Sequence, residues 1–250
     1  MNHTLLSKRE WCEKAPNSYI KGTSETWKQK ANRELLSLLC RTPFESNEAA
    51  ERGILFENQV YGAASMPEDE VTGSDHFKEV VNTVRGAKFQ TFHTKDMELN
   101  DCIIRWYGIL DAEFKNKIID IKTTAKLKVE KYKTSPQADI YKWLTNKDQF
   151  TYVIAEWDKF PKINRIMHID SPSMFSSLCN VLKQEAIEFI EWLRVLGYFE
   201  LYRDCYCHLG QGWKSEIAKK GPKQQEQLAA FYAPYQHKYL SQFQEDSEGF

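Results

Sequence analysis

Two aspartates and a lysine carry charge into segments of this 250-residue chain that otherwise predict buried β-strand. Asp111 follows the apolar segment 102–110, and Asp120 and Lys122 lie within the segment 117–122. A carboxylate that loses its water in such surroundings is destabilising unless something compensates its charge. Mg²⁺ or Mn²⁺ is the natural compensation, because these ions prefer oxygen ligands. The lysine could orient or help deprotonate an attacking water and offset charge on a phosphate oxygen, which suggests metal-assisted hydrolysis.

A two-residue turn at 115–116 joins the two predicted strands into a hairpin. We expect Phe114 to pair with Lys117 across this turn. Counting outward then places Asp111 opposite Asp120, with β-carbons roughly 5 Å apart on one face of the sheet. The lysine shares that face because side chains alternate with period two. The same three residues could instead belong to the polar face of a solvated hairpin.

Residues 46–65 predict a helix, since Ser46 can cap it, acidic residues follow in its first turn and few breakers precede Pro67. Glu57 lies in the middle of this helix at helical spacing from apolar residues. Its carboxylate is therefore expected on or beside the apolar stripe. An ordinary exposed glutamate is the alternative.

A second helix is predicted to begin at Ser135-Pro136 and to run to about Asn146, with the serine as N-cap and the proline at the first helical position. Gln137 and Tyr141 lie one turn apart on one face of it and could reach a common target, such as a phosphate or the lysine. The alternative is a helix edge with an amphipathic tyrosine.

Taken in chain order, these residues resemble a known signature. Asp111, an eight-residue gap and then Asp120-Ile121-Lys122 are similar to the D…(D/E)xK motif of the PD-(D/E)xK nuclease superfamily, with aspartate where many members carry glutamate. The segment 52–61 resembles the RG…E…Y helix of the RecB-like and lambda-exonuclease (YqaJ-like) branches. The segment 137–141 resembles the QxxxY motif of RecB-like nucleases. The resemblance covers roughly residues 46 to 170.

The resemblance implies a role for each residue of these motifs. Four groups would bind the metal ion, Mg²⁺ or Mn²⁺: Glu57, Asp111, Asp120 and the backbone carbonyl of Ile121. Lys122 would be the catalytic lysine. The other candidates would position the substrate or contact DNA phosphates: Gln137, Tyr141, Arg52, Thr123 and Thr124. Some RecB-like relatives carry a histidine shortly before the motif glutamate, whereas this chain has Gly53 four residues before Glu57.

The remaining patterns predict an α/β fold. Two further strands are expected at 150–157 and 164–169, which makes a central mixed β-sheet of about four strands flanked by helices. The resemblance implies that this is a restriction-endonuclease-like core. Amphipathic spacing predicts helices at 24–40 and 173–208, with Gly197 as a break in the second.

Composition limits the domain organisation. With 42% hydrophobic residues the chain can bury one substantial core, so a single domain over 1–250 is expected. It would comprise an N-terminal helical region (1–45), the catalytic core (46–170) and a C-terminal helical extension (171–250). No apolar run is long enough to span a bilayer and the N-terminus lacks a signal-peptide segment, so we expect a soluble, cytoplasmic protein with no membrane partner.

The six cysteines show no disulfide framework, so reduced thiols are expected. Some RecB-like nucleases hold an iron–sulfur cluster with one early cysteine and a tight late trio. Cys205 and Cys207, with Cys179 upstream, do not match that pattern, so an iron–sulfur cluster is not expected.

The formal net charge of −1 argues, by itself, against a nucleic-acid partner. The distribution of charge favours one, because residues 112–133 hold seven lysines against three acidic residues. A second basic stretch, 214–223, holds four lysines against one glutamate. Basic residues around an acidic metal centre suit DNA phosphates, although the lysines of the second stretch could equally lie on a solvated face.

Residues and resemblance together predict a Mg²⁺- or Mn²⁺-dependent deoxyribonuclease. The family members that look closest are exonucleases of recombination and repair, often phage-encoded. We therefore expect an exonuclease acting on a duplex end or a single strand of DNA, with recombination or repair proteins as partners. The alternatives are an endonuclease, a non-catalytic nucleic-acid-binding module of the same fold, and an accessory protein that acts through protein contacts.

Overall fold

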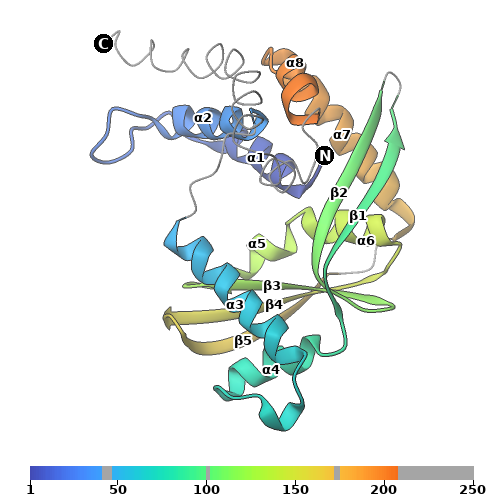
Figure 1. Ribbon diagram of the computed structural model, residues 1–250. Helices are drawn as coiled ribbons and strands as arrows, with labels where there is room; N and C mark the ends of the chain where they lie inside the picture. Colours follow the sequence, from blue (N-terminus) through green and yellow to red (C-terminus); the bar gives the residue numbers. More distant parts are fainter. Residues whose placement is uncertain (41–46, 100–101, 172–174, 208–250) are drawn as a thin grey trace, which may run out of the picture. The chain divides into compact units, whose positions relative to one another are not determined.

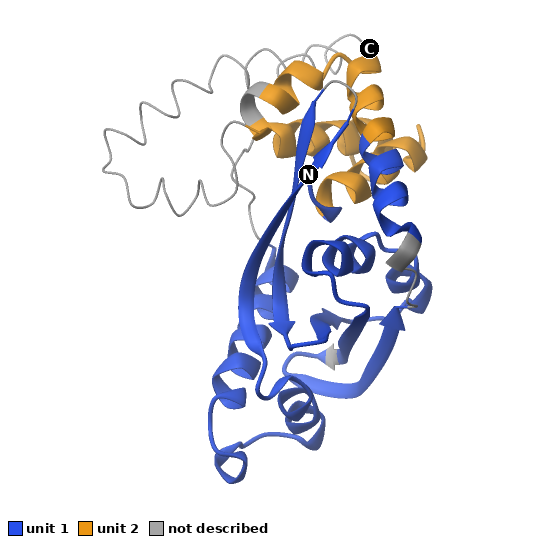
Figure 2. Ribbon diagram, turned by 90° about the vertical axis from the view of Figure 1, so that its right-hand side faces the viewer, with its two compact units in different colours: residues 1–3, 45–186 blue, residues 4–44, 187–250 orange. Residues whose placement is uncertain are grey.

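The computed structural model describes residues 1–40, 47–99, 102–171 and 175–207. The chain forms two compact units, one of residues 1–3 and 45–186 and one of residues 4–44 and 187–250 (Figure 2). Every site residue predicted from the sequence belongs to the first unit.

A five-stranded mixed sheet forms the centre of the first unit, with the strands in the order β1-β2-β3-β4-β5 (Figure 1). The strands are β1 (Lys88–Glu98), β2 (Ile103–Glu113), β3 (Lys117–Thr124), β4 (Gln149–Lys159) and β5 (Lys162–Ser171). β3 and β4 run parallel, and the other three pairs of neighbours run antiparallel. The predicted α/β class with a central mixed sheet is confirmed, and the number of strands is five rather than about four.

The additional strand is β1, which no apolar alternation marks in the sequence. Along nearly its whole length its residues alternate between exposed and partly exposed, and Met97 is its one buried residue. β1 lies at the edge of the sheet and pairs with β2, whereas β2 pairs with β3 only through Ala112 and Glu113. The greater part of the β1–β2 hairpin therefore extends beyond the other strands, as Figure 1 shows.

Helices pack against this sheet from two parts of the chain. α3 (Glu48–Ala64) and α4 (Asp75–Val84), with the 3₁₀ turn Glu68–Glu70 between them, share one apolar core with the strands. Its members include Phe56, Val60, Val80, Ile119, Ile121 and Val153. α5 (Val129–Lys133) and α6 (Gln137–Thr145) connect β3 to β4, and α6 packs against β1, β2 and β4.

Both predicted site helices form, with small differences at their ends. Asn47, rather than Ser46, is the N-cap of α3: its side chain accepts a hydrogen bond from the N–H of Ala50 at 2.9 Å. Ser46 lies outside the described residues. In α6 the N-cap is Pro136 rather than the predicted Ser135, although the hydroxyl of Ser135 accepts from the N–H of Gln137 at 3.3 Å; the helix ends at Asn146, as predicted, in the left-handed conformation.

The second unit is helical. Its elements are α1 (His3–Lys14), α2 (Trp27–Leu39), the last part of α7 (Phe175–Val195), α8 (Phe199–Leu201) and a π-helix (Tyr202–Cys207). α2 confirms the amphipathic prediction, since it buries Ala31, Leu35, Leu36 and Leu39. Gly197 ends α7 as predicted: its φ is +72°, and the next residue, Tyr198, donates its N–H back to the carbonyl of Leu193 at 2.8 Å.

No disulfide joins the cysteines whose side chains are described: Cys12, Cys40, Cys102, Cys179 and Cys207. The side chain of Cys205 and the basic stretch 214–223 lie outside the described residues. Of the helices seen in the described part of the chain, none combines the length and the apolar composition that crossing a bilayer requires.

Candidate active site

The two predicted aspartates come together where the β2–β3 hairpin opens. The N–H of Phe114 donates to the carbonyl of Lys117 at 2.9 Å, which closes the two-residue turn as predicted. The two ladder pairs, Ala112–Ile119 and Glu113–Ile118, have the predicted register, but the ladder ends before Asp111 and Asp120, which therefore form no ladder pair. Instead, Oδ2 of Asp111 accepts a hydrogen bond from the backbone N–H of Ile121 at 2.9 Å. The predicted cross-strand pair is thus corrected to a side-chain-to-backbone bridge, because β2 leaves β3 and continues with β1 alone.

Asp120 is almost completely enclosed, with an exposed fraction of 1%. Its Oδ1 accepts a hydrogen bond from Nε2 of Gln137 at 2.6 Å, and the ammonium of Lys122 lies 2.5 Å from its Oδ2. In spite of this ion pair, Oδ2 has no hydrogen bond of good geometry. Burial is the main cause that raises the pKa of Asp120 above its ordinary value, and Lys122 opposes the rise.

Glu57 reaches this group from α3. Burial, followed by repulsion from Asp111, raises the pKa of Glu57 to about 7. Gly53, one turn earlier in α3, allows the helix to approach β3 closely, since a β-carbon at this position would lie 3.2 Å from Oγ1 of Thr123. The close contact of helix and strand therefore brings Glu57 to the aspartates.

Lys122 lies among these three carboxylates. Burial is the largest single effect on its ammonium and lowers the pKa, but the negative charges of Asp120 and Asp111 outweigh it. The pKa of Lys122 is therefore raised above its ordinary value. With this raised pKa the side chain is a cation and a hydrogen-bond donor at neutral pH.

The two predicted residues of α6 lie against the same group. Gln137 binds Asp120 directly, and Tyr141 packs its ring onto β2 at Gly108, where a β-carbon would lie only 2.5 Å from Cε1 of the ring. Burial, followed by the charge of Asp120, raises the pKa of Tyr141. Gln137 therefore reaches the buried aspartate directly, whereas the ring of Tyr141 packs on β2.

The remaining predicted residues have other contacts. The guanidinium of Arg52 forms an ion pair with Glu48 and lies 5.9 Å from the ring centroid of Phe160. The hydroxyl of Thr124 donates to the carbonyl of Lys126 at 3.0 Å and accepts from its N–H at 3.2 Å, which closes a local turn. Contacts of Arg52, Thr123 and Thr124 with phosphate stay predictions.

Three further side chains adjoin the site: His3, Tyr61 and Gln90. Nε2 of Gln90 donates to the hydroxyl of Tyr61 at 2.9 Å and to Oδ1 of Asp111 at 3.5 Å. The ring of His3 meets that of Tyr141 edge-on with centroids 6.0 Å apart. Tyr61 belongs to the predicted helix motif, but no local pattern could indicate the other two, because β1 has no strand signal and His3 lies far away in the sequence.

The acidic groups fit a hard divalent cation. Oδ2 of Asp120 is buried and, apart from its ion pair with Lys122, lacks a hydrogen bond of good geometry; Asp111 lies beside it across the opened hairpin. Within the described residues, no three His, Cys, Asp or Glu side chains are grouped as direct ligands of one ion. Mg²⁺ commonly takes one or two protein carboxylates and completes its shell with waters and phosphate oxygens. Asp111 and Asp120, with Glu57 nearby, can supply the protein carboxylates of such a shell.

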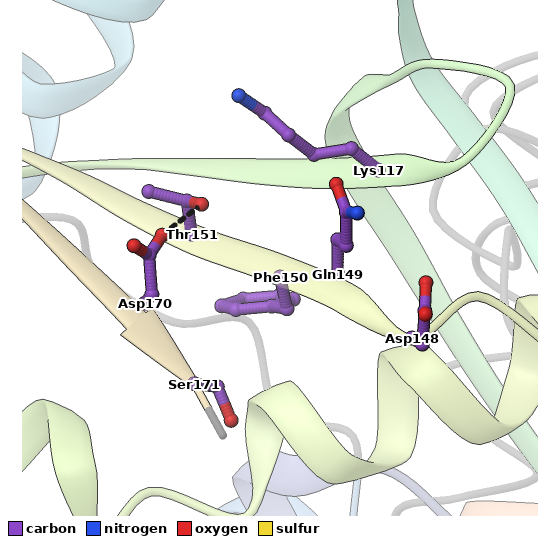
Figure 3. A pocket seen from close by; sticks show the side chains of 7 residues that line it. All are labelled: Lys117, Asp148, Gln149, Phe150, Thr151, Asp170 and Ser171. Carbon is purple, nitrogen blue, oxygen red and sulfur yellow. Dashed lines mark hydrogen bonds between the residues drawn. The ribbon is translucent and has the colours of Figure 1, made fainter. Parts of the chain in front are cut away.

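A separate pocket of about 460 Å³ lies at the start of β3 and β4 (Figure 3). Its walls are formed by Lys117, Asp148, Gln149, Phe150, Thr151, Asp170 and Ser171. The site residues described above are not among them. The hydroxyl of Thr151 donates to Asp170 at 2.6 Å, so this carboxylate already has a partner within the protein.

No protein-family model matches this chain, and no curated protein sequence matches it. Among solved structures, an alkaline exonuclease (LHK-Exo) from Laribacter hongkongensis is similar with a TM-score of 0.44 and 14% identity, over 88% of this chain and 93% of that one. The protein SSO0001 is similar with a TM-score of 0.32 and 15% identity, over 64% of this chain and 83% of that one. Likeness of this extent does not assign an activity to the chain.

Proposed function

We propose that this chain is a metal-dependent deoxyribonuclease that acts as an exonuclease. The observation that carries the proposal is the meeting of Asp111, Asp120 and Lys122 where the β2–β3 hairpin opens, with Glu57 close enough for its charge to interact with theirs. Crowded, partly desolvated carboxylates destabilise a fold. A cluster of carboxylates that lowers stability in this way is expected at a functional site, where binding or catalysis requires it.

The two aspartates would hold Mg²⁺ or Mn²⁺, with Glu57 and the carbonyl of Ile121 as further candidate ligands. When bound, such an ion makes a water molecule more acidic and offsets charge on a phosphate oxygen. The protein orients both aspartates in advance: the N–H of Ile121 holds Asp111, and the amide of Gln137 holds Asp120.

Lys122 would supply positive charge and N–H donors beside the scissile phosphodiester. Because its pKa is raised, the ammonium keeps its proton at neutral pH. This favours donation to the attacking water or to a phosphate oxygen over abstraction of a proton.

Exposed lysines follow directly after Lys122 in the segment that leads through α5: Lys126, Lys128, Lys131 and Lys133. Positive side chains so placed suit the phosphates on either side of the reacting one. The preference for an exonuclease comes from the resemblance of the motifs to exonucleases of recombination and repair, since the same chemistry serves either mode of cleavage.

Linear and covalently closed circular DNA of one sequence, each with a Mg²⁺ or Mn²⁺ titration, test the proposal. An exonuclease degrades the linear form alone, whereas cleavage of the circle would identify an endonuclease. Asp120→Asn and Lys122→Met should each slow cleavage at least about 10²-fold. Asp148→Asn, just before β4, and Lys162→Met, at the start of β5, change exposed residues away from the site and are the matched controls that should keep the rate.

Undiminished degradation in EDTA, or by the Asp120→Asn protein, would refute the metal-dependent mechanism. Binding of DNA without cleavage under any divalent ion would instead identify a non-catalytic nucleic-acid-binding module. Absence of both DNA binding and metal binding would favour an accessory protein.

A further inference from the structure

Gln90 has an unusual backbone conformation for a residue inside a strand. Its φ is +52°, in the left-handed region that residues with a β-carbon rarely adopt. The ladder between β1 and β2 pairs the neighbours of Gln90 with the neighbours of Asp111 and omits these two residues. The strand thus departs from regular geometry directly opposite a candidate metal ligand.

Core packing does not account for this conformation. β1 is an edge strand, and Gln90 is exposed to solvent. The other described non-glycine residue with positive φ, Asn146, ends α6, where a left-handed residue is common. Gln90 has no such helix end to form, so its conformation points to the contacts of its side chain.

The side chain of Gln90 joins Tyr61 to Asp111. Its Nε2 donates to the tyrosine hydroxyl at 2.9 Å and to Oδ1 of the aspartate at 3.5 Å. The ring of Tyr61 is stacked on that of Phe89, with centroids 4.6 Å apart, and this fixes the hydroxyl that holds the amide. Asp111 therefore has a donor on each oxygen, the N–H of Ile121 on Oδ2 and the amide of Gln90 on Oδ1.

We infer that Gln90 is a positioning residue that orients the carboxylate of Asp111 for a divalent cation, an inference that rests on the function proposed above. Each carboxylate oxygen has two lone pairs, so one donor on each leaves capacity for a cation. A neutral amide suits this place, because a cationic side chain would repel the metal ion and an anionic one would repel Asp111. The positive φ of Gln90 is the backbone conformation that places its side-chain amide beside Asp111 from an edge strand.

The test is the affinity of the full chain for Mn²⁺, measured by calorimetry without DNA, in Gln90→Gly. Glycine accepts the positive φ and removes the amide. We expect affinity to fall about ten-fold while the unfolding midpoint in EDTA does not fall. Thr94→Gly is the matched control in the same strand, at an exposed position of ordinary conformation. It should lower the unfolding midpoint and keep Mn²⁺ affinity.

Two more variants strengthen the test. Gln90→Asn tolerates the left-handed region but carries a shorter amide, so it should show the same loss of affinity and provides a second variant if glycine prevents folding. Tyr61→Phe should weaken Mn²⁺ binding less than Gln90→Gly. The double variant should be no weaker than Gln90→Gly alone, because both changes act through one amide.

Unchanged Mn²⁺ affinity in Gln90→Gly overturns the inference, as does an equal loss in Thr94→Gly. With linear DNA, the Mg²⁺ concentration for half-maximal cleavage should rise by the same factor while KM for DNA stays constant. A rise in KM alone would indicate a DNA contact instead. If the wild-type protein binds Mn²⁺ but cleaves no DNA, the proposed function fails and the affinities still decide the role of Gln90. If it binds no Mn²⁺, both fail.

Discussion

The carboxylate of Asp111 accepts a hydrogen bond from the backbone N–H of Ile121 at 2.9 Å, at the residue between Asp120 and Lys122. This bond takes the place of ladder pairing with β3, which in β2 includes only Ala112 and Glu113, the two residues after Asp111. It ties the strand that carries one aspartate to the strand that carries the other aspartate and the lysine. One side chain therefore serves both the sheet and the candidate site.

Asparagine and alanine at position 111 should separate these two roles. Asp111→Asn keeps an acceptor for Ile121 and should change the free energy of unfolding by less than about 1 kcal/mol, yet cleavage should fall at least about 10²-fold. Asp111→Ala leaves a buried N–H without a partner and should cost about 1–3 kcal/mol. Urea denaturation in EDTA and cleavage of linear DNA provide the two measurements. Equal stability of the two variants would contradict the structural role.

Loss of the Gln137 amide should impair the site through Asp120. Gln137→Ala removes the donor to Oδ1 of a carboxylate with 1% exposure, so we expect cleavage to slow by about 10–100-fold. Gln149→Ala changes an exposed glutamine on β4 and is the matched control. The cleavage rates of the two variants are compared at saturating DNA and Mg²⁺. Similar rates for both would refute a positioning role for Gln137.

A side chain at position 108 should displace Tyr141. The β-carbon of Gly108→Ala would lie 2.5 Å from Cε1 of the tyrosine, and we expect a loss of about 1–3 kcal/mol in the free energy of unfolding. Gly62→Ala in α3 meets nothing within 4 Å and should instead stabilise by about 0.5–1 kcal/mol. Thermal unfolding compares the two. A neutral Gly108→Ala would show that the ring moves aside freely.

The stability of the fold should decrease in acid partly because of His3. Burial, and then the charge of Lys122, lower the pKa of His3 to about 4 from an ordinary 6.5. Between these values the unfolded chain binds more protons than the folded one, so stability rises with pH through this window and is lost as the pH falls. His3→Gln should remove about 1–3 kcal/mol of that loss.

Urea denaturation in EDTA at pH 7 and at pH 4.5 measures the contribution of His3. His76→Gln, at a histidine of α4 with 42% of its side chain exposed, is the control for losing an imidazole. A His3→Gln protein with the same acid sensitivity as the wild type would contradict the prediction.

The lysines that follow the site should contribute to DNA binding through charge. Lys126→Ala/Lys128→Ala should lower affinity for DNA at low salt and reduce the slope of log affinity against log salt concentration by between about 1 and 2. Lys159→Ala/Lys162→Ala, at the exposed end of the β4–β5 hairpin, is the matched control. Fluorescence anisotropy over a salt series gives both slopes, and equal slopes would show that these lysines are not specially placed.

Local signals predicted the elements that position the site, because each signal acts within a few residues. The turn at 115–116, the acidic first turn of α3, the start of α6 after Ser135 and the end of α7 at Gly197 all depend on neighbours in sequence. β1 was not predicted, because no local signal marks it. An edge strand that buries one residue has no apolar alternation, and its pairing with β2 sustains it.

The order of the residues is enough to identify the groups available: two aspartates and a lysine on two strands joined by a tight turn, and a glutamate on a helix with an apolar stripe. Apolar residues that repeat every two positions in a strand, or every 3.6 in a helix, can be recognised from the sequence alone. Three relationships appear only in the folded chain: the strands part at Asp111, its carboxylate accepts from Ile121, and Gln90 reaches it from an edge strand. These relationships depend on where β2 exchanges one partner strand for another, and this choice is made by contacts between residues distant in the chain.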